Sequence, residues 1–466
     1  MRTNEKTFRP YEPNQMYLMP PALNEWLPEG HLAYFVRDVV TRLDLSAIFD
    51  AYTRESKGPG GAAPFHPTMM TQVLLYAYCV GCPSSRKIEK RLHEDVAFRV
   101  LGANETPDFR TISLFRKRHF EALKDLFTQV LQLCKRRGLV KLGAVALDGT
   151  KVKANAALDR NRTYEKLEKE KRELDAVVEG LLREADAVDE EEDRLYGPDK
   201  RGDELPADLA DAARRREKIG ELLRDMELEA AEAAAEKQAQ IDARAKEEEE
   251  TGQKKRGRKP EPPAATPDPR TKRNLTDPDS RIMKTRQGYV QGYNAQAVVD
   301  VDSGVIVAAD VTQEANDVRQ LIPMLEQVKE ETGEEPQNLL ADAGYFSEDN
   351  LDGFEDKNTE PYIAVANDFK EKQRLGPRTA PRGRIPENLT PKQRMERKLL
   401  TKKGREMYRN RGSTVEPVFG HIKEERGLRE FLLRGIDKAR AEWKLICATH
   451  NILKLWRSGN GLPEAV

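Results

Sequence analysis

The sequence predicts an α/β protein with a mixed sheet, a helical N-terminal domain and an inserted helical hairpin or coiled coil. Three observations predict this architecture. Apolar residues recur at helical spacing through residues 1–138, as in TMMTQVLLYAYCVG. Short runs of β-branched and small apolar residues, such as LVKLGAVALDG, appear at 139–149 and again after residue 288. Between these regions lies a long stretch rich in Glu, Lys and Ala.

The bulk composition bounds the class of protein. The chain has 466 residues, of which 34% are charged, and its formal net charge is -1. This charge is segregated, because residues 370–411 hold 15 Lys and Arg against 4 Asp and Glu. Such a locally basic segment can bind phosphate whatever the net charge of the whole chain.

Membrane and secreted classes do not fit the sequence. No apolar run approaches the ~18 residues that a membrane span needs, and MRTNEKTFRPYEPNQ lacks the apolar core of a signal peptide. Four cysteines are too few for a disulfide framework in a chain of this length. We therefore expect a soluble protein of a reducing cytoplasm, with no membrane partner.

The N-terminal domain is expected to span residues 1–138 and to serve DNA binding or dimerisation. His66-Pro67 should open one helix, Ser84-Ser85 a second (RKIEKRLHEDVAFRVLG) and residues 111–113 a third (LFRKRHFEALKDLFTQVLQLCKRRG). The first turns of the third helix carry Arg116, Lys117 and Arg118, which suit contacts with the DNA backbone. A solvated helix face explains each of these residues equally well.

The middle of the chain, residues 157–275, is expected to be an insertion. Two segments with apolar positions every three or four residues predict an antiparallel helical pair. A Pro-, Lys- and Arg-rich linker follows, which should be disordered when free. Within this linker, Arg256 and Arg258 belong to an RGRKP stretch similar to an AT-hook, which binds the minor groove; a plain basic linker is the simpler interpretation.

Removing this insertion leaves an element order that carries the chemistry. A first strand, within 139–156, ends at Asp148; residues 276–457 then supply a hairpin pair about Asp302-Ser303-Gly304, a helix capped by Asn316 or Asp317, and a strand that ends at Asp342. A helix capped by Ser347, a strand at 361–367 and a helix starting at Ser413 that carries Glu416 complete the order. It is the order of the ribonuclease H-like fold, in which the first and fourth strands are neighbours. Residues 458–466 form a tail.

Three carboxylates in this order suit metal-dependent phosphoryl transfer. Mg²⁺ prefers oxygen ligands, and two such ions about 3.5–4 Å apart can activate the attacking oxygen and stabilise the leaving one. Alternatives exist for each acid. Asp148 and Asp342 precede glycine-containing segments and could shape turns. Ser413-x-x-Glu416 matches a capping box, in which the Glu side chain satisfies the backbone of its own helix.

Four stretches resemble the DDE transposases of bacterial insertion sequences. They are AVALDGTKVKANA (144–156), TDPDSRIMKTRQGYVQGYNAQAVVD (276–300), LLADAGYFS (339–347) and MYRNRGSTVEPVFGHIK (407–423). FHPTMMTQVLLYAYCVGCPSSRKIEKRL (65–92) is similar to the N-terminal domain of the group that also has a coiled-coil insertion.

The resemblance implies that Asp148, Asp342 and Glu416 are the catalytic and metal-binding triad. It implies that Tyr408, Arg411 and Lys423 complete a Tyr-Arg-Glu-Lys signature and contact DNA, although the gap between Arg411 and Glu416 is one residue longer than usual. Expected cofactors are two Mg²⁺ ions, for which Mn²⁺ can substitute. Expected partners are double-stranded DNA, as terminal inverted repeats and target, and a second subunit in a synaptic complex.

The activity implied is cleavage of the element ends followed by strand transfer into target DNA. Three rivals stay open: a metal-dependent nuclease that does not join strands, an inactive DNA-binding relative, and a structural coiled-coil protein. Among the remaining polar residues, Asp277 and Asp279 either bind substrate or shape a turn. Cys79-x-x-Cys82 has zinc-like spacing, but buried thiols fit its apolar helix better. His450, Trp443 and Trp456 are expected to pack in the core.

Overall fold

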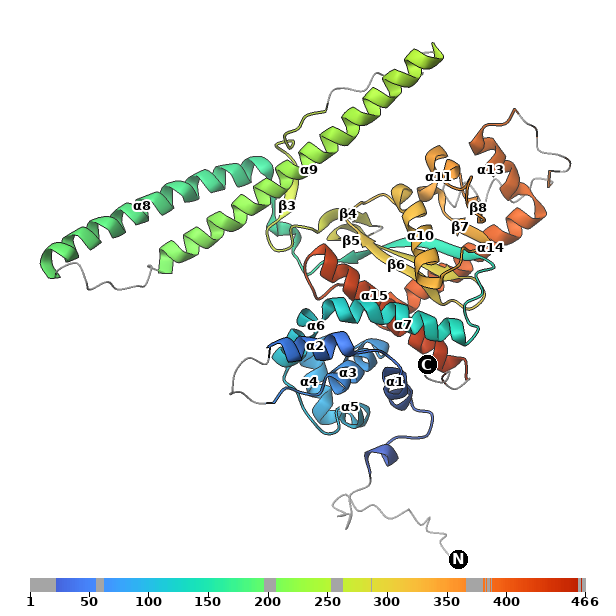
Figure 1. The fold of residues 1–466 in the computed structure, drawn as a ribbon, viewed down its shortest axis with the longest axis horizontal. Coiled ribbons are helices and arrows are strands. Elements are labelled where there is room, and N and C mark those ends of the chain that lie inside the picture. Colours follow the sequence, from blue (N-terminus) through green and yellow to red (C-terminus); the bar gives the residue numbers. More distant parts are fainter. Residues whose placement is uncertain are drawn as a thin grey trace, which may run out of the picture.

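The computed structural model describes residues 22–55, 63–196, 207–252, 263–285, 287–365, 380–381, 383, 386, 388–459 and 462. A mixed sheet lies at the centre, with a group of helices beneath it and a long helical pair extending to one side (Figure 1). The α/β class with a mixed sheet is thus confirmed. In the part of the chain described, no helix is long and apolar enough to cross a membrane.

Short helices build the N-terminal region. His66 caps α3 by accepting the N–H of Thr68 at 3.3 Å, with Pro67 at the first helical position, as predicted. Cys79 and Cys82 are buried free thiols, and the burial raises the pKa of Cys79 to about 12. The helices are α1 (Leu32–Val40), α2 (Ser46–Glu55), α3 (Pro67–Cys79), α4 (Ser85–Glu94), α5 (Val96–Leu101), α6 (Phe109–Arg118) and α7 (Phe120–Arg136), after a short 3-10 turn η1 (Leu23–Glu25).

Two of the predicted helices are each divided. Asp95 ends α4 and caps α5, because its Oδ1 accepts the N–H groups of Ala97 and Phe98 at 2.9 and 3.4 Å. His119 separates α6 from α7, and α6 begins after the cap Asp108, earlier than expected. Residues 116–118 therefore form the last turn of α6, and the prediction that they occupy the first turns of a long helix is wrong.

The sheet places two acids at one point. Its strand order is β4-β5-β1-β7-β8, with β6 pairing the second half of β5. β1 pairs antiparallel with β5 and parallel with β7. The strands are β1 (Val145–Lys153), β4 (Arg281–Thr285), β5 (Gly288–Asp300), β6 (Ile306–Thr312), β7 (Asn338–Ala341) and β8 (Glu360–Ile363).

The sequence suggested that the first strand ends at Asp148, but Asp148 lies inside β1. β1 continues to Lys153 because β5 pairs with it along its whole length. The parallel pairing with β7, however, stops at Ala146 opposite Leu340. Asp148 and Asp342 each lie two residues beyond that last pair, so both acids stand where the two strands separate.

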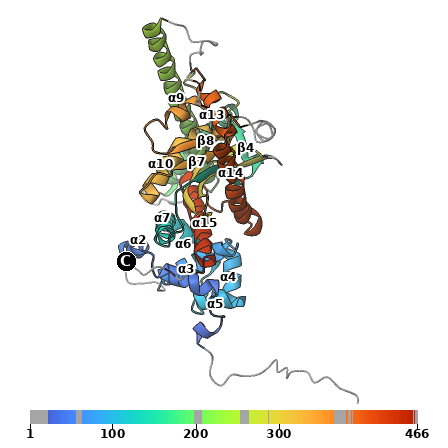
Figure 2. The same ribbon diagram turned by 90° about the vertical axis from the view of Figure 1, so that its right-hand side faces the viewer.

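Helices cover the sheet and join it to the N-terminal region. α15 (Ile436–Arg457) packs against α7, α3 and β6 (Figures 1 and 2). Trp443 and His450 are buried, as predicted, and the Trp443 indole donates to the Gln296 carbonyl at 2.8 Å. Trp456 is 37% exposed, so its predicted place in the core is wrong. The other helices about the sheet are α10 (Leu321–Thr332), α11 (Glu348–Asp352), α13 (Pro391–Leu400) and α14 (Lys402–Gly420), followed by a π-helical turn η5 (His421–Glu425).

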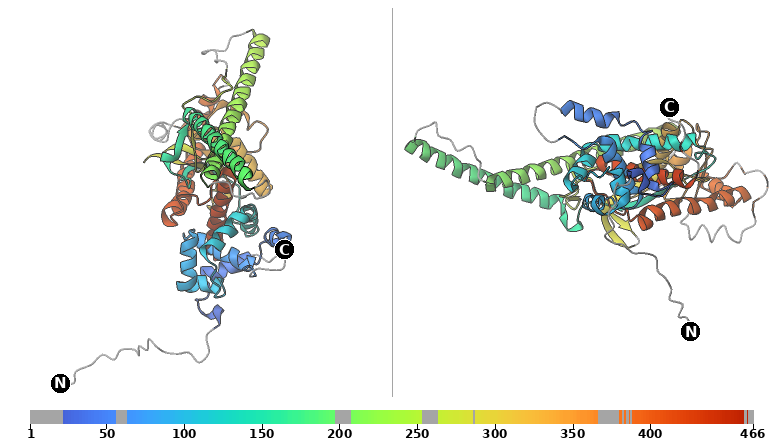
Figure 3. Two further views of the ribbon diagram at one scale, coloured as in Figure 1. Left: turned by 90° about the vertical axis from the view of Figure 1, so that its left-hand side faces the viewer. Right: turned by 90° about the horizontal axis from the view of Figure 1, so that it is seen from below.

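The insertion is a pair of long helices that projects from the sheet (Figures 1 and 3). α8 (Tyr164–Tyr196) and α9 (Ala207–Thr251) pack through a small apolar cluster around Leu167, Ile219 and Met226. The short strands β2 (Asn161–Thr163) and β3 (Lys272–Asn274) pair antiparallel at its base. Arg281 of β4 donates to Glu229 of α9 at 3.0 Å, which ties the insertion to the sheet. Arg256 and Arg258 lie outside the described residues.

Candidate active site

The centre of the site is the pair Asp148 and Asp342. The Asp148 carboxylate is largely buried, with its side chain 20% exposed. Burial raises the pKa of Asp148 to about 7, and the negative charge of Asp342 raises it further. Asp342 precedes the 3-10 turn η4 (Ala343–Tyr345), and its Oδ1 accepts the Gly344 N–H at 2.8 Å.

Arg411 of α14 partly balances this charge. Its Nη1 lies 3.2 Å from Asp148 Oδ2, and its side chain is only 5% exposed. The positive charge of Arg411 acts against the upward shift in the pKa of Asp148, as does the Gly149 N–H, which donates to Oδ1 at 2.8 Å. Arg411 is thus in contact with Asp148, and its predicted contact with DNA stays a prediction.

A third acid, Asp317, also belongs to this centre. We expected it only as a possible helix cap, but its side chain caps no helix. Its Oδ1 instead accepts from Asn294 Nδ2 at 2.6 Å and from Gln296 Nε2 at 2.8 Å, both on β5. Lys151 Nζ lies 3.7 Å away. No local signal reveals this role, because the partners of Asp317 lie on a strand more than twenty residues earlier.

Two glycines let these groups approach each other. A Cβ at Gly149 would lie 2.5 Å from Gln296 Nε2 and 2.8 Å from Asp317 Oδ1. A Cβ at Gly344 would lie 3.0 Å from Asp342 Oδ1 and 3.6 Å from Asp317 Oδ2. The Asp317 and Asp342 carboxylates therefore both lie near Gly344, in space that a larger residue at this position would fill.

Glu416 stands apart from this pair. It lies in the interior of α14, which Thr401 caps by accepting the Gly404 N–H at 3.0 Å. A helix does not start at Ser413, so that prediction and the capping-box alternative for Glu416 are both wrong. The Glu416 side chain is exposed. It lies beside Gly412 of the preceding turn, where an added Cβ would be 3.4 Å from Glu416 Oε1. Among the residues described, no three His, Cys, Asp or Glu side chains are grouped closely enough to hold a metal ion.

Comparison with known families decides the class. Residues 263–452 match a family model described as Transposase DDE domain. Residues 21–118 match a second, described as Transposase domain (DUF772). The chain belongs to the DDE transposases. Searches of curated proteins and of solved structures found no match to it.

The protein is therefore a DNA transposase, and transposases of this family generally use divalent metal ions. The donor set of this transposase is compatible with such an ion. Asp148 and Asp342 are hard oxygen donors whose mutual repulsion a cation would relieve, and Mg²⁺ is often held by one or two carboxylates plus water. Burial is the main cause of the raised pKa of Asp148, and repulsion by Asp342 adds to it.

The rest of the Tyr-Arg-Glu-Lys signature of the transposase lies along α14 and the turn after it. Tyr408 is 8% exposed, and the Arg411 guanidinium carbon lies 5.8 Å from the centre of its ring. Lys423 Nζ donates to Thr150 Oγ1 and to the Lys151 carbonyl, both at 2.7 Å. Lys423 thus binds the same strand as Asp148, two or three residues further along.

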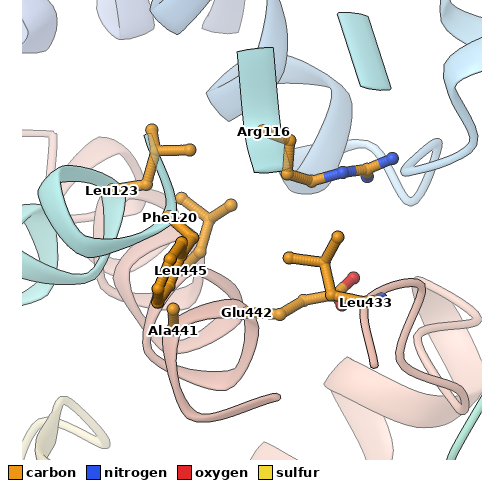
Figure 4. A pocket seen from close by; sticks show the side chains of 7 residues that line it. All are labelled: Arg116, Phe120, Leu123, Leu433, Ala441, Glu442 and Leu445. Atoms are coloured by element: carbon orange, nitrogen blue, oxygen red, sulfur yellow. Dashed lines mark hydrogen bonds between the residues drawn. The ribbon is translucent and has the colours of Figure 1, made fainter. Parts of the chain in front are cut away.

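Arg116 is buried and its partners are all within the protein. Its guanidinium donates to Tyr78 Oη at 3.0 Å, to the Pro83 carbonyl at 2.8 Å and to Ser85 Oγ at 2.9 Å. Tyr78 also donates to Glu442 of α15 at 2.8 Å. Figure 4 shows Arg116 and Glu442 beside a small pocket lined mostly by apolar side chains of α7 and α15. Arg116 therefore links the N-terminal helices to α15. Because it is buried, it does not offer its guanidinium to DNA, as the sequence had suggested.

The two neighbours of Arg116 differ from it. Lys117 is exposed. Arg118 lies over the Tyr52 ring at 4.5 Å and donates to the Ala51 carbonyl at 3.0 Å. Asp277 and Asp279 accept the N–H groups of Gly435 and Ile436 at 3.2 and 2.9 Å, so they hold the start of α15 against the sheet.

Proposed function

We propose that this transposase cuts the ends of an insertion sequence and joins them to target DNA within a ribonuclease H-like catalytic domain. The observation that carries the proposal is the pair of acids, Asp148 and Asp342, which lie just beyond the last residues that pair β1 with β7 and of which Asp148 is largely buried. The antiparallel order β6, β5, β1 followed by parallel β7 and β8 supports the fold. We assign the domains as residues 1–138, 139–156 with 276–457, and the insertion 157–275.

Asp148, Asp342 and Glu416 are proposed to hold two Mg²⁺ ions, which would activate the attacking oxygen and stabilise the leaving one. Arg411 keeps the Asp148 carboxylate oriented. Gln296 donates to Asp317 and accepts from the Tyr345 hydroxyl, so the Asp317 network contacts the segment that begins at Asp342. Because Glu416 is exposed on the helix that carries Arg411, it completes the ligand set only when α14 shifts relative to β1.

The two chemical steps are in-line displacements at phosphorus, first a hydrolysis and then a transesterification. In the first, water attacks phosphorus at the element end, a new P–O bond forms and the bond to the 3′-oxygen breaks, which frees a 3′-hydroxyl. In the second, that hydroxyl attacks a target phosphodiester and releases a target 3′-hydroxyl. No covalent bond between protein and DNA is needed. We further propose a cytoplasmic enzyme that acts as a homodimer in a synaptic complex, with the paired helices α8 and α9 helping to join subunits.

Joining of a pre-cleaved end is the direct test of this function. Duplex DNA from the terminal inverted repeats, already cut at its 3′ end, is incubated with the protein, plasmid target and Mg²⁺. We expect labelled ends to become linked to the plasmid, and to stay unlinked when the metal is chelated. A nuclease would cut intact ends and join nothing. A protein that binds the ends but neither cuts nor joins them would be an inactive relative.

Asp317→Asn tests the proposed positioning role of this acid. Its carboxylate accepts from two amide groups, and an asparagine would present a donor to them. We expect the rate of cleavage to fall about 10–100-fold, with a higher Mg²⁺ concentration at half-maximal rate, as for a group that orients a metal ligand.

The matched control is Asp349→Asn, which removes an exposed carboxylate from the first turn of α11. It should leave both quantities unchanged. A rate loss in Asp317→Asn with an unaltered Mg²⁺ requirement would show that Asp317 only stabilises the fold.

A further inference from the structure

A cleft beside the acid pair gathers four cationic side chains from two parts of the chain. It has a volume of about 240 Å³ and is lined by Lys151 and Lys153 of β1, Lys423 of η5 and Arg429. Thr285, the last residue of β4, and Gln287, between β4 and β5, also line it. The proposed catalytic acids do not line it.

Backbone pairing fixes two of these cations side by side. The Lys153 N–H donates to the Arg429 carbonyl at 3.1 Å, and the Phe431 N–H donates to the Lys153 carbonyl at 2.9 Å. Residues 429–431 therefore run along the end of β1. This pairing fixes the backbone of Lys153 beside that of Arg429, so two side chains of like charge start from neighbouring positions.

The charges in the cleft are only partly compensated. Arg429 contacts Glu424, and Lys151 lies 3.7 Å from Asp317. Lys153 is exposed and has no ion pair among the described residues. Burial lowers the pKa of Lys423 to about 8, and the positive charges of Arg429 and Lys151 add to this shift. An anion in the cleft would offset these positive charges.

We propose that this cleft binds phosphates of the DNA strand that continues past the cleaved bond. This inference rests on the proposed function, which places the cleaved bond of the DNA strand at Asp148. Lys423 bonds to Thr150, two residues beyond Asp148, so the cleft begins next to the acid pair. Cations that line a cleft next to the reacting centre can hold successive phosphates without reading base sequence.

The test is binding without metal, which needs no catalysis. Fluorescence anisotropy with duplex DNA of an element end is measured in a chelator over a range of salt concentrations. Each phosphate contact contributes a slope of about 0.9 in the logarithm of affinity against the logarithm of salt. We expect Lys153→Gln and Arg429→Gln each to weaken binding about tenfold at 0.1 M salt. The double variant should show a slope shallower by about 2.

Lys329→Gln is the matched control, because Lys329 is an exposed lysine of α10 outside the cleft. It should keep the affinity and slope of the parent protein. Unchanged slopes in the double variant would overturn the proposal. If the parent protein fails to cut or join DNA while the double variant still loses slope, only the proposed function fails. If the parent cuts and joins but the double variant binds as the parent does, only the cleft assignment fails.

Discussion

The Asp148→Asn variant is expected to cut element-end DNA at least about 10³-fold more slowly than the parent while binding that DNA in a chelator with unchanged affinity. A metal ligand at the reacting centre supplies several kcal/mol of transition-state stabilisation, and each ~1.4 kcal/mol is a factor of ten in rate. Asparagine keeps the size of the side chain but removes the charge that holds a divalent ion.

The same variant should be more stable than the parent at alkaline pH. The pKa of Asp148 in the folded protein is raised to about 7, so below that pH the group is mostly protonated and costs little to bury. The folded parent loses stability as pH rises from about 4, where this carboxyl ionises in the unfolded chain, to about 7, where it ionises beside Asp342 in the folded protein. Asparagine stays neutral throughout. We expect a melting temperature about 2–4 °C higher for the variant at pH 8, and a smaller difference at pH 5.

Cleavage gels and thermal melts at the two pH values check both expectations. Asp159→Asn serves as the control, because Asp159 is exposed and lies outside the four stretches that resemble transposases. A variant that cuts DNA at the parental rate would remove Asp148 from the catalytic centre. Equal melting temperatures at pH 8 would instead contradict the unfavourable burial of its charge.

Signals that lie within a few residues predicted much of this fold. The His66-Pro67 start of α3, the Ser347 cap of α11 and the turn at 302–304 between β5 and β6 are set by local backbone geometry, and all three occur. Asp148 and Asp342 were predictable because each comes directly after a short run of apolar residues. The pairing register of β1 then explains why they meet.

Features that depend on distant partners were not predictable. Ser413 and Glu416 have the spacing of a capping box, but α14 begins after its cap Thr401, twelve residues before Ser413. Asp317 looks like a cap in the sequence, but its hydrogen bonds go to β5. Arg116 looks like a surface charge, but Tyr78 and Ser85 enclose it. The local sequence around a polar side chain does not identify its hydrogen-bond partner when that partner lies far away in the chain.

Glu416→Gln is expected to abolish cleavage about as completely as Asp148→Asn, by at least about 10³-fold. Its stability should respond differently. Glu416 is exposed and has no hydrogen bond or ion pair among the described residues. Neutralising it therefore relieves no repulsion, and the melting temperature should stay equal to that of the parent at both pH 5 and pH 8.

Glu406→Gln is a closely matched control, because Glu406 is another exposed glutamate on α14. It should leave cleavage unchanged. If Glu416→Gln cuts DNA at the parental rate, Glu416 is not the third acid, and the ligand set must come from Asp148, Asp342 and their neighbours.

The geometry of α14 explains why such a test is needed. Arg411 and Glu416 are five residues apart, which on an α-helix is a rise of about 7.5 Å and a turn of about 140°. While Arg411 contacts Asp148, Glu416 therefore leaves α14 in a different direction and is exposed. A movement of α14 that withdraws Arg411 would remove one positive charge from Asp148 and could bring Glu416 toward it. Loss of activity in Glu416→Gln without loss of stability would therefore mean that the catalytic arrangement forms only after this helix moves.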